Sequence, residues 1–171
     1  MRGFVQIYTG DGKGKTTAAL GLAVRAAGAG LRVYIGQFVK NADYSELHIL
    51  RRLADAITVA QYGLGCMLVR TPTREDCDAA RRGLAAFGAA MTSGAFDLVI
   101  ADEINVACAL GLLDEQDLLA LVAQRPPEVE LVLTGRGAPA AVLETADLIT
   151  EMRPIRHYYQ QGVLARKGIE G

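Results

Sequence analysis

A run of small and basic residues near the amino terminus has the composition of a polyphosphate-binding loop. It reads Thr9-Gly10-Asp11-Gly12-Lys13-Gly14-Lys15-Thr16-Thr17 and lies between an apolar run at 4–8 and an alanine- and leucine-rich run at 18–24. Glycines let successive backbone N–H groups converge on phosphate oxygens, and the N-terminus of a following helix adds positive potential. Lys15 would supply a mobile charge, and Thr16 a hydroxyl ligand for Mg²⁺. This context predicts phosphate binding rather than a flexible turn.

The loop departs from the common phosphate-loop pattern at one position. The pattern is Gly-x4-Gly-Lys-Ser/Thr, and counting back from Gly14 places Thr9 where the first glycine is expected. Gly10 follows one residue later. We expect all nine loop residues, Thr9 to Thr17, to contribute to nucleotide binding.

Two carboxylates follow an apolar run further along the chain. Asp102 and Glu103 come directly after the predicted strand at 97–101. A P-loop protein places the acid that holds Mg²⁺, directly or through water, at this point of the sheet. Thr16, Asp102 and Glu103 are therefore the candidate metal ligands. Glu103 could bind the metal or polarise a water molecule, and the alternative is an acidic pair at a helix N-terminus.

Other polar residues also lie at the ends of predicted strands. Arg136 stands on the glycine-flanked turn after the strand at 129–134, where it could reach a triphosphate, although an ordinary exposed arginine fits the same sequence. Gln37 and Lys40 end and follow the strand at 32–38. We expect both to contact ligand, with a solvated lysine as the alternative at position 40.

Residue types needed for several other chemistries are sparse. The chain has two histidines and no His or Cys cluster with metal-ligand spacing. Its three cysteines lack any Cys-x-x-Cys pair, which argues against a disulfide framework and a structural zinc site and favours a reducing cytoplasm. No motif for a serine or cysteine nucleophile is present, so covalent catalysis by the protein is not expected.

Composition restricts the class of protein further. The 171 residues fit one domain, and 51% hydrophobic with 22% charged residues is typical of a globular chain. A net charge of −1 gives no general attraction to nucleic acid or anionic membranes. No apolar run approaches the length of a membrane span, and no signal peptide is visible.

Short β-branched runs alternate with helical stretches along the chain. Helix starts are supported by Thr73 with Asp76 three residues later, and by Asp114. The pattern predicts a single α/β domain over residues 1–171, with a P-loop NTPase-like, mostly parallel sheet of about six strands and helices on both faces. Strands are predicted at 4–8, 32–38, 57–61, 97–101, 129–134 and 148–150, and helices at 15–27, 45–54, 73–91, 115–123 and 139–145.

Three irregular segments follow predicted strands, at 39–44, 62–72 and 135–138. Ligands of open α/β sheets bind beyond the carboxyl ends of the strands. We therefore expect these loops to gather beside the phosphate loop and to touch any second substrate.

Several segments together resemble the P-loop family of corrinoid adenosyltransferases. The Thr-Gly-Arg-Gly turn and the Arg-Pro-Ile-Arg-His and Arg-Lys-Gly-Ile-Glu sequences near the carboxyl end are more specific than the phosphate loop, which many unrelated NTPases share. The matching segments are residues 8–18, 37–40, 102–103, 133–137, 146–157 and 162–170.

The resemblance implies transfer of the 5′-deoxyadenosyl group from ATP to Co(I) of a reduced corrinoid, with release of triphosphate. Cobalt is then the nucleophile, in agreement with the lack of a protein nucleophile. Lys13, Lys15, Arg136 and Mg²⁺ are suited to offset charge on the leaving triphosphate, with Lys15, Glu103 and Arg136 as candidate catalytic residues. The family binds ATP in the opposite sense to ordinary P-loop NTPases, and Thr9 is compatible with this.

The corrinoid side of the site departs from well-known family members, which use a Phe-x-Trp element and an N-terminal extension. This chain has no Trp and starts at its first predicted strand. The corresponding region is 62–68, so Tyr62, Leu64 or Met67, or a partner subunit, would supply the apolar surface. The resemblance also implies a homodimer and a flavin-type reductase that delivers Co(I).

Two alternatives remain on the sequence alone. Glu103 beside Asp102 is also compatible with an ATPase or a small-molecule kinase. A nucleotide-regulated binding module is the other, although no Asn-Lys-x-Asp motif for guanine recognition is present.

Overall fold

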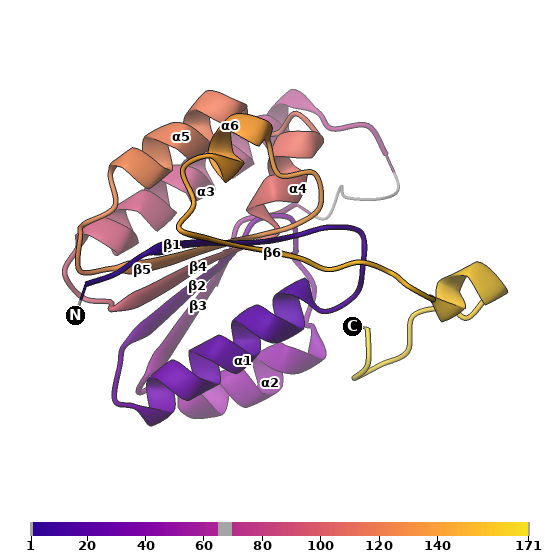
Figure 1. Ribbon diagram of the computed structural model, residues 1–171, viewed down its shortest axis with the longest axis horizontal. Coiled ribbons are helices and arrows are strands. Elements are labelled where there is room, and N and C mark those ends of the chain that lie inside the picture. Colours follow the sequence, from indigo (N-terminus) through magenta and orange to yellow (C-terminus); the bar gives the residue numbers. More distant parts are fainter. Residues whose placement is uncertain (1, 65–69, 171) are drawn as a thin grey trace.

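The protein is built on a six-stranded sheet in which every paired strand runs parallel to its neighbour (Figure 1). The computed structural model describes residues 2–64 and 70–170. The strand order is β3-β2-β4-β5-β1-β6, so β5 lies between the strand of the phosphate loop and the strand of the acidic pair. The strands are β1 (Val5–Thr9), β2 (Val33–Gln37), β3 (Ile57–Gln61), β4 (Leu98–Asp102), β5 (Glu130–Thr134) and β6 (Leu148–Glu151).

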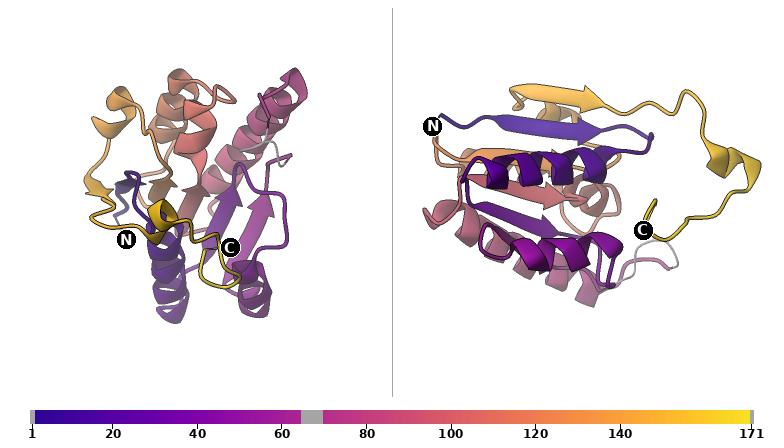
Figure 2. Two further views of the ribbon diagram at one scale, coloured as in Figure 1. Left: turned by 90° about the vertical axis from the view of Figure 1, so that its right-hand side faces the viewer. Right: turned by 90° about the horizontal axis from the view of Figure 1, so that it is seen from below.

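Helices cover both faces of this sheet. Figures 1 and 2 show α1 and α2 on one face and α3 to α6 on the other. A sheet covered in this way needs strands that are apolar on both sides, and all five residues of β2 and of β4 are buried. The helices are α1 (Lys15–Gly28), α2 (Ser45–Leu50), α3 (Arg74–Thr92), α4 (Ile104–Ala109), α5 (Glu115–Ala123) and α6 (Ala140–Leu143).

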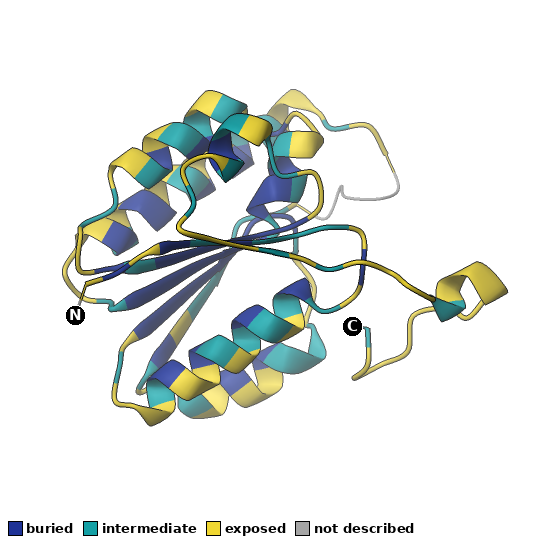
Figure 3. Cartoon of the chain, in the orientation of Figure 1, coloured by how far each residue is buried: buried dark blue, intermediate teal, exposed yellow. Residues whose placement is uncertain are grey.

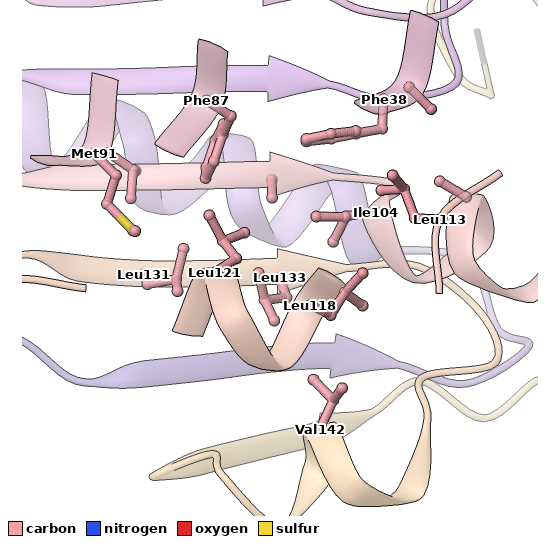
Figure 4. Packing of buried hydrophobic residues seen from close by; sticks show 14 of the residues in the cluster. Phe38, Phe87, Met91, Ile104, Leu113, Leu118, Leu121, Leu131, Leu133 and Val142 are labelled. Carbon is pink, nitrogen blue, oxygen red and sulfur yellow. The ribbon is translucent and has the colours of Figure 1, made fainter. Parts of the chain in front are cut away.

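Two hydrophobic clusters hold the layers together, one on each face. Beneath α1, small residues at helical spacing, Ala19, Ala23 and Ala26, bring the helix close to the sheet. The other cluster is larger and includes Phe38, Phe87 and residues of α4, α5 and α6 (Figure 4). Burial is concentrated in the sheet and on the inner sides of the helices, whereas the segment after β6 is largely exposed (Figure 3).

Strand register brings the carboxyl ends of neighbouring strands to one edge. Gln37 at the end of β2 is paired with Asp102 on one side and with Gln61 on the other. Thr134 at the end of β5 lies opposite Tyr8, and Thr9 lies opposite Glu151. The polar residues that end the strands therefore form a row, and the phosphate loop opens from the same edge.

The predicted strands are confirmed, with boundary shifts of at most one residue, and the sheet is wholly rather than mostly parallel. The helix expected at 45–54 divides into α2 and a 3₁₀ turn, Arg51–Leu53. The helix expected at 139–145 is only α6, four residues long. Helix α4 was not predicted, because it is short and its N-cap residue, Glu103, makes no side-chain capping bond.

The N-terminus of α3 confirms the expected capping box. The Thr73 hydroxyl accepts a hydrogen bond from the Asp76 N–H, and the Asp76 carboxylate accepts one from the Thr73 N–H. Asp114 and Asp117 form the same arrangement at α5. These caps fix where the two long helices of this face begin.

We expect Thr73→Ala to lower the free energy of unfolding by about 1 kcal/mol, because the first turn of α3 loses its capping acceptor. Thr73→Ser keeps the hydroxyl and should lose much less. Urea denaturation followed by circular dichroism measures both, and equal losses for the two variants would contradict the capping role.

Candidate functional site

The phosphate loop uses its glycines where the backbone requires them. β1 ends at Thr9, α1 begins at Lys15, and Gly10 and Gly14 have φ of 90° and 125°. L side chains rarely adopt such angles. Thr9 still has strand geometry and pairs with β6, so a glycine is not needed there. The departure from the common pattern therefore reflects a turn that starts one residue later.

The segment after β6 supports the same loop. The Met152 N–H donates to the Thr9 carbonyl at 2.8 Å, and the Gly12 N–H donates to the Met152 carbonyl at 2.7 Å. A Cβ on Gly10 or Gly12 would lie 2.5 or 2.7 Å from the Met152 carbonyl oxygen. The loop has room only for glycine at these two positions.

Lys15 lies inside the loop rather than in solvent. Its side chain is buried, and Nζ donates to the carbonyls of Gly10 at 2.6 Å and Gly12 at 2.7 Å. Burial and the neighbouring Arg136 guanidinium lower the pKa of Lys15. The N-cap of α1 is Gly14, which has no side chain to cap the helix, so the first-turn N–H groups remain suited to an anion.

Asp102 is the most connected side chain of the site. It is only 2% exposed. Oδ1 accepts hydrogen bonds from the Thr16 hydroxyl at 2.9 Å and the Thr134 hydroxyl at 2.8 Å. Oδ2 lies 3.4 Å from Gln37 Nε2 and 3.1 Å from Lys40 Nζ. The carboxylate thus joins the start of α1 to β2, β5 and the loop after β2.

Glu103 adopts an unusual backbone conformation beside it. Its φ of 61° is the only positive φ at a non-glycine position in the described ranges 2–64 and 70–170. The Glu103 N–H donates to the Thr134 hydroxyl at 3.0 Å. Burial raises the pKa of the Glu103 carboxyl and the Asp102 carboxylate adds to this, while Lys40, Lys15 and Arg136 oppose it. Strain of this kind is common at functional sites.

The turn after β5 places Arg136 at the edge of this cluster. Arg136 is exposed, and its flanking glycines, Gly135 and Gly137, have φ of 131° and 67°. A Cβ on Gly135 would lie 2.9 Å from the Val106 backbone nitrogen, so the turn packs closely on α4. The positive charge of Arg136 lowers the pKa of Lys15 and opposes the rise in the pKa of Glu103.

Of the three predicted corrinoid-facing residues, the structure describes Tyr62 and Leu64, and their environments differ. The Tyr62 ring packs against Phe38 with ring centroids 5.3 Å apart, and its hydroxyl contacts that of Tyr34. Burial and this contact raise the pKa of Tyr62. Leu64 is half exposed at the start of the following loop. Met67 lies outside the described residues.

The structure brings most predicted site residues together and adds several that the sequence interpretation missed. Thr134 joins Asp102 to the Glu103 backbone, and Glu46 accepts from Gln37 at 3.3 Å and from Lys40 at 3.2 Å. Met152 supports the phosphate loop. The position of Thr134 at a strand end was a usable signal, whereas nothing local marked Glu46 or Met152.

The site contains hydroxyl and carboxylate oxygens close to one another. Within the described ranges no group of three or more His, Cys, Asp or Glu side chains could hold a metal ion. Thr16 and Asp102 nevertheless offer a hydroxyl and a carboxylate in contact, the pairing that holds Mg²⁺ together with nucleotide phosphates. In the described part of the chain, no helix is long and apolar enough to cross a membrane.

Comparisons with known proteins agree over the whole chain. A family model described as ATP:corrinoid adenosyltransferase BtuR/CobO/CobP matches residues 1–171. A corrinoid adenosyltransferase of Pseudomonas aeruginosa is 32% identical over 99% of this chain and 84% of its own length. Corrinoid adenosyltransferases of Escherichia coli K12 and Salmonella typhimurium are 34% and 33% identical, each over 99% of this chain and 86% of the relative.

We expect Gly10→Ala to weaken ATP binding by about tenfold or more, because an alanine there is strained and meets the Met152 carbonyl. Gly21→Ala is the matched control, since Gly21 is exposed in α1 with nothing within 4 Å of an added Cβ. It should bind ATP normally. Isothermal titration calorimetry measures both, and unchanged affinity in Gly10→Ala would contradict the role of the loop.

Glu103→Gln should stabilise the protein at neutral pH. A carboxyl whose pKa rises on folding contributes stability that is complete below its ordinary pKa of about 4.3 and is lost as pH rises through the raised value. The Tm of Glu103→Gln should therefore exceed that of the parent protein at about pH 7 and equal it below about pH 4. The exposed Glu144→Gln is the control; a lower Tm for Glu103→Gln at neutral pH would contradict the assignment.

Proposed function

We propose that the phosphate loop, Asp102, Glu103 and Arg136 carry out the reaction of the ATP:corrinoid adenosyltransferase family. The chain belongs to this family. The enzyme transfers the 5′-deoxyadenosyl group of ATP to Co(I) of a reduced corrinoid and releases triphosphate. The observation that carries the residue assignment is the contact of Thr16 with Asp102, which joins the phosphate loop to the acid of β4. The family match over residues 1–171 supports one catalytic domain.

The protein itself forms and breaks no covalent bond in this reaction. The electron pair of Co(I) forms the bond to the ribose C5′, and the pair of the broken C5′–O bond leaves with the triphosphate. No proton transfer is needed at the reacting carbon. The protein must align C5′ with cobalt and stabilise the charge that gathers on the leaving group.

Three positive features face the region of the triphosphate. The first-turn N–H groups of α1 and the Lys15 ammonium bind the phosphates, and Arg136 approaches from the turn after β5. A buried cation acts more strongly than an exposed one because solvent screens it less. Lys13, which is exposed, adds charge at the outer side of the loop.

The donor set of the site fits a hard divalent cation. Thr16, Asp102 and Glu103 present only oxygen ligands, which Mg²⁺ prefers, and they are few, which suits an ion that keeps water and phosphate ligands as well. When bound, Mg²⁺ would neutralise charge on the triphosphate. Gln37 is fully buried and bonded to Gln61 and Asp102, so it would act by orienting the Asp102 carboxylate.

The corrinoid would bind over the loop that begins at Tyr62. Tyr62 is anchored by Phe38, Tyr34 and the close approach of Gly83, so it gives this loop a fixed start. Leu64 and Met67 would then contribute apolar contacts. Co(I) needs a strong reductant, which supports a flavin-type reductase partner and a reducing, cytoplasmic location.

A homodimer is the proposed assembly. The segment after β6 projects from the body of the protein (Figure 2) and exposes large apolar side chains, with Ile155 93%, Leu164 78% and Tyr159 71% accessible. Apolar surface of this extent commonly marks an interaction site.

Product analysis separates this function from an ATPase or kinase. Incubation with ATP, Mg²⁺ and a chemically reduced corrinoid should yield a light-sensitive cobalt–carbon product and intact triphosphate. ADP and phosphate without alkylated corrinoid would instead support hydrolysis or phosphoryl transfer at Glu103. Nucleotide binding without any turnover would support a binding module.

Lys15→Ala should reduce transfer by about 100-fold or more, because the loop loses both its internal cation and two hydrogen bonds. Arg25→Ala, at the exposed far end of the same helix, should keep parental activity. Circular dichroism checks that both variants fold, and parental transfer by folded Lys15→Ala would contradict the assignment.

A further inference from the structure

Lys40 bridges two carboxylates of the site, those of Asp102 and Glu46. Its Nζ lies 3.1 Å from Asp102 Oδ2 and 3.2 Å from Glu46 Oε1. The side chains of Lys40 and Glu46 are only 16% and 18% exposed. Burial lowers the pKa of Lys40, but the Asp102 and Glu46 carboxylates outweigh this and raise it. Lys40 therefore carries its charge at the place where Asp102 is proposed to meet a metal.

The carboxylate of Asp102 has little capacity left for another ligand. A carboxylate offers about four acceptor sites on two oxygens. Thr16 and Thr134 use Oδ1, while Gln37 and Lys40 use Oδ2. A divalent cation bound by Asp102 must replace one of these partners.

Lys40 is the partner that can leave with least disruption. Thr134 and Gln37 are fully buried and also bond to the Glu103 backbone and to Gln61. Thr16 is itself a proposed metal ligand. Lys40 has a long flexible side chain and carries a charge that a cation on the same carboxylate would repel.

A second position for the displaced ammonium is already present. Glu46 is within ion-pair distance, and Nζ lies 5.1 Å from the centre of the Tyr44 ring, an arrangement that favours a cation. Lys40 can thus leave Asp102 while it keeps a carboxylate and an aromatic face.

We propose that Lys40 is the internal counter-cation of Asp102, and that the divalent metal bound with ATP displaces it toward Glu46 and Tyr44. Without metal, Lys40 spares the protein a buried unpaired carboxylate, which would be strongly destabilising. When the metal binds, the cost of moving Lys40 away from Asp102 weakens the binding of the metal. Lys40 therefore sets how strongly the metal promotes ATP binding. This inference rests on the proposed metal role of Asp102.

The test compares ATP binding with Mg²⁺ and with EDTA by isothermal titration calorimetry, without corrinoid so that ATP is not consumed. The ratio of the two dissociation constants measures how much the metal improves binding. Lys40→Met keeps the length of the side chain and removes its charge, so the ratio should rise about tenfold. Glu46→Gln removes the alternative partner and should lower the ratio about threefold.

Two further variants distinguish displacement from a general change in charge. Arg51→Gln lowers net charge by the same amount as Lys40→Met, but Arg51 pairs with the exposed Asp43 at 2.8 Å, so the ratio should stay unchanged. In the Lys40→Met background, Glu46→Gln should have no effect, because its influence acts through the lysine. An undiminished effect of Glu46→Gln in that background would overturn the proposal.

The remaining outcomes separate this inference from the proposed function. A parent protein that binds ATP better with Mg²⁺, together with an unchanged ratio in Lys40→Met, overturns the displacement alone. A parent ratio of about one overturns the metal role of Asp102 as well. If Lys40→Met fails to fold, the lowered ratio in Glu46→Gln supports the proposal and a raised or unchanged ratio overturns it.

Discussion

The buried Asp102 carboxylate is the constraint on which the site depends. An ionised carboxylate that is 2% exposed is tolerated only when hydrogen bonds and opposite charge compensate for lost hydration. Its partners come from separate parts of the chain: Thr16 from α1, Thr134 from β5, Gln37 from β2 and Lys40 from the loop after β2. The hydrogen bonds and ion pair that stabilise the Asp102 carboxylate therefore fix the phosphate loop, three strand ends and one loop relative to one another.

Strand order explains why Thr134 has a central role. β5 separates β1 from β4, so the phosphate loop and the acidic pair are not direct neighbours. Thr134 at the end of β5 pairs with Tyr8 of β1, and its hydroxyl donates to Asp102 and accepts from the Glu103 backbone N–H. The left-handed conformation of Glu103 turns the chain into α4 at this point. The Thr134 hydroxyl thus ties the end of β5 to the acidic pair, and the Thr16 hydroxyl joins the phosphate loop to Asp102.

Local patterns predicted much of the fold and the residues of the phosphate loop, because buried parallel strands, capping boxes and glycine-rich turns leave signals within a few residues. The acidic pair was found in the same way. The roles of Thr134 and Met152 arise from strand order and register, which link distant positions. Glu46 lies close in sequence to Lys40, but its contact depends on how the loop after β2 leads into α2. Helix α4 was missed because it is short and starts at a residue without a side-chain cap. Lys40 was predicted, but its ion pairs with Asp102 and Glu46 were not.

The support that Met152 gives to the phosphate loop has a consequence for how the enzyme is made. Residues 9 to 12 emerge early during synthesis, yet the backbone groups that hold their shape belong to residue 152, far along the sequence. Contacts this distant in sequence carry a large loop-closure entropy cost, which slows their formation. A nascent chain would therefore carry an incomplete nucleotide site until residue 152 had left the ribosome. ATP would then bind chains that include residue 152 better than chains truncated before it.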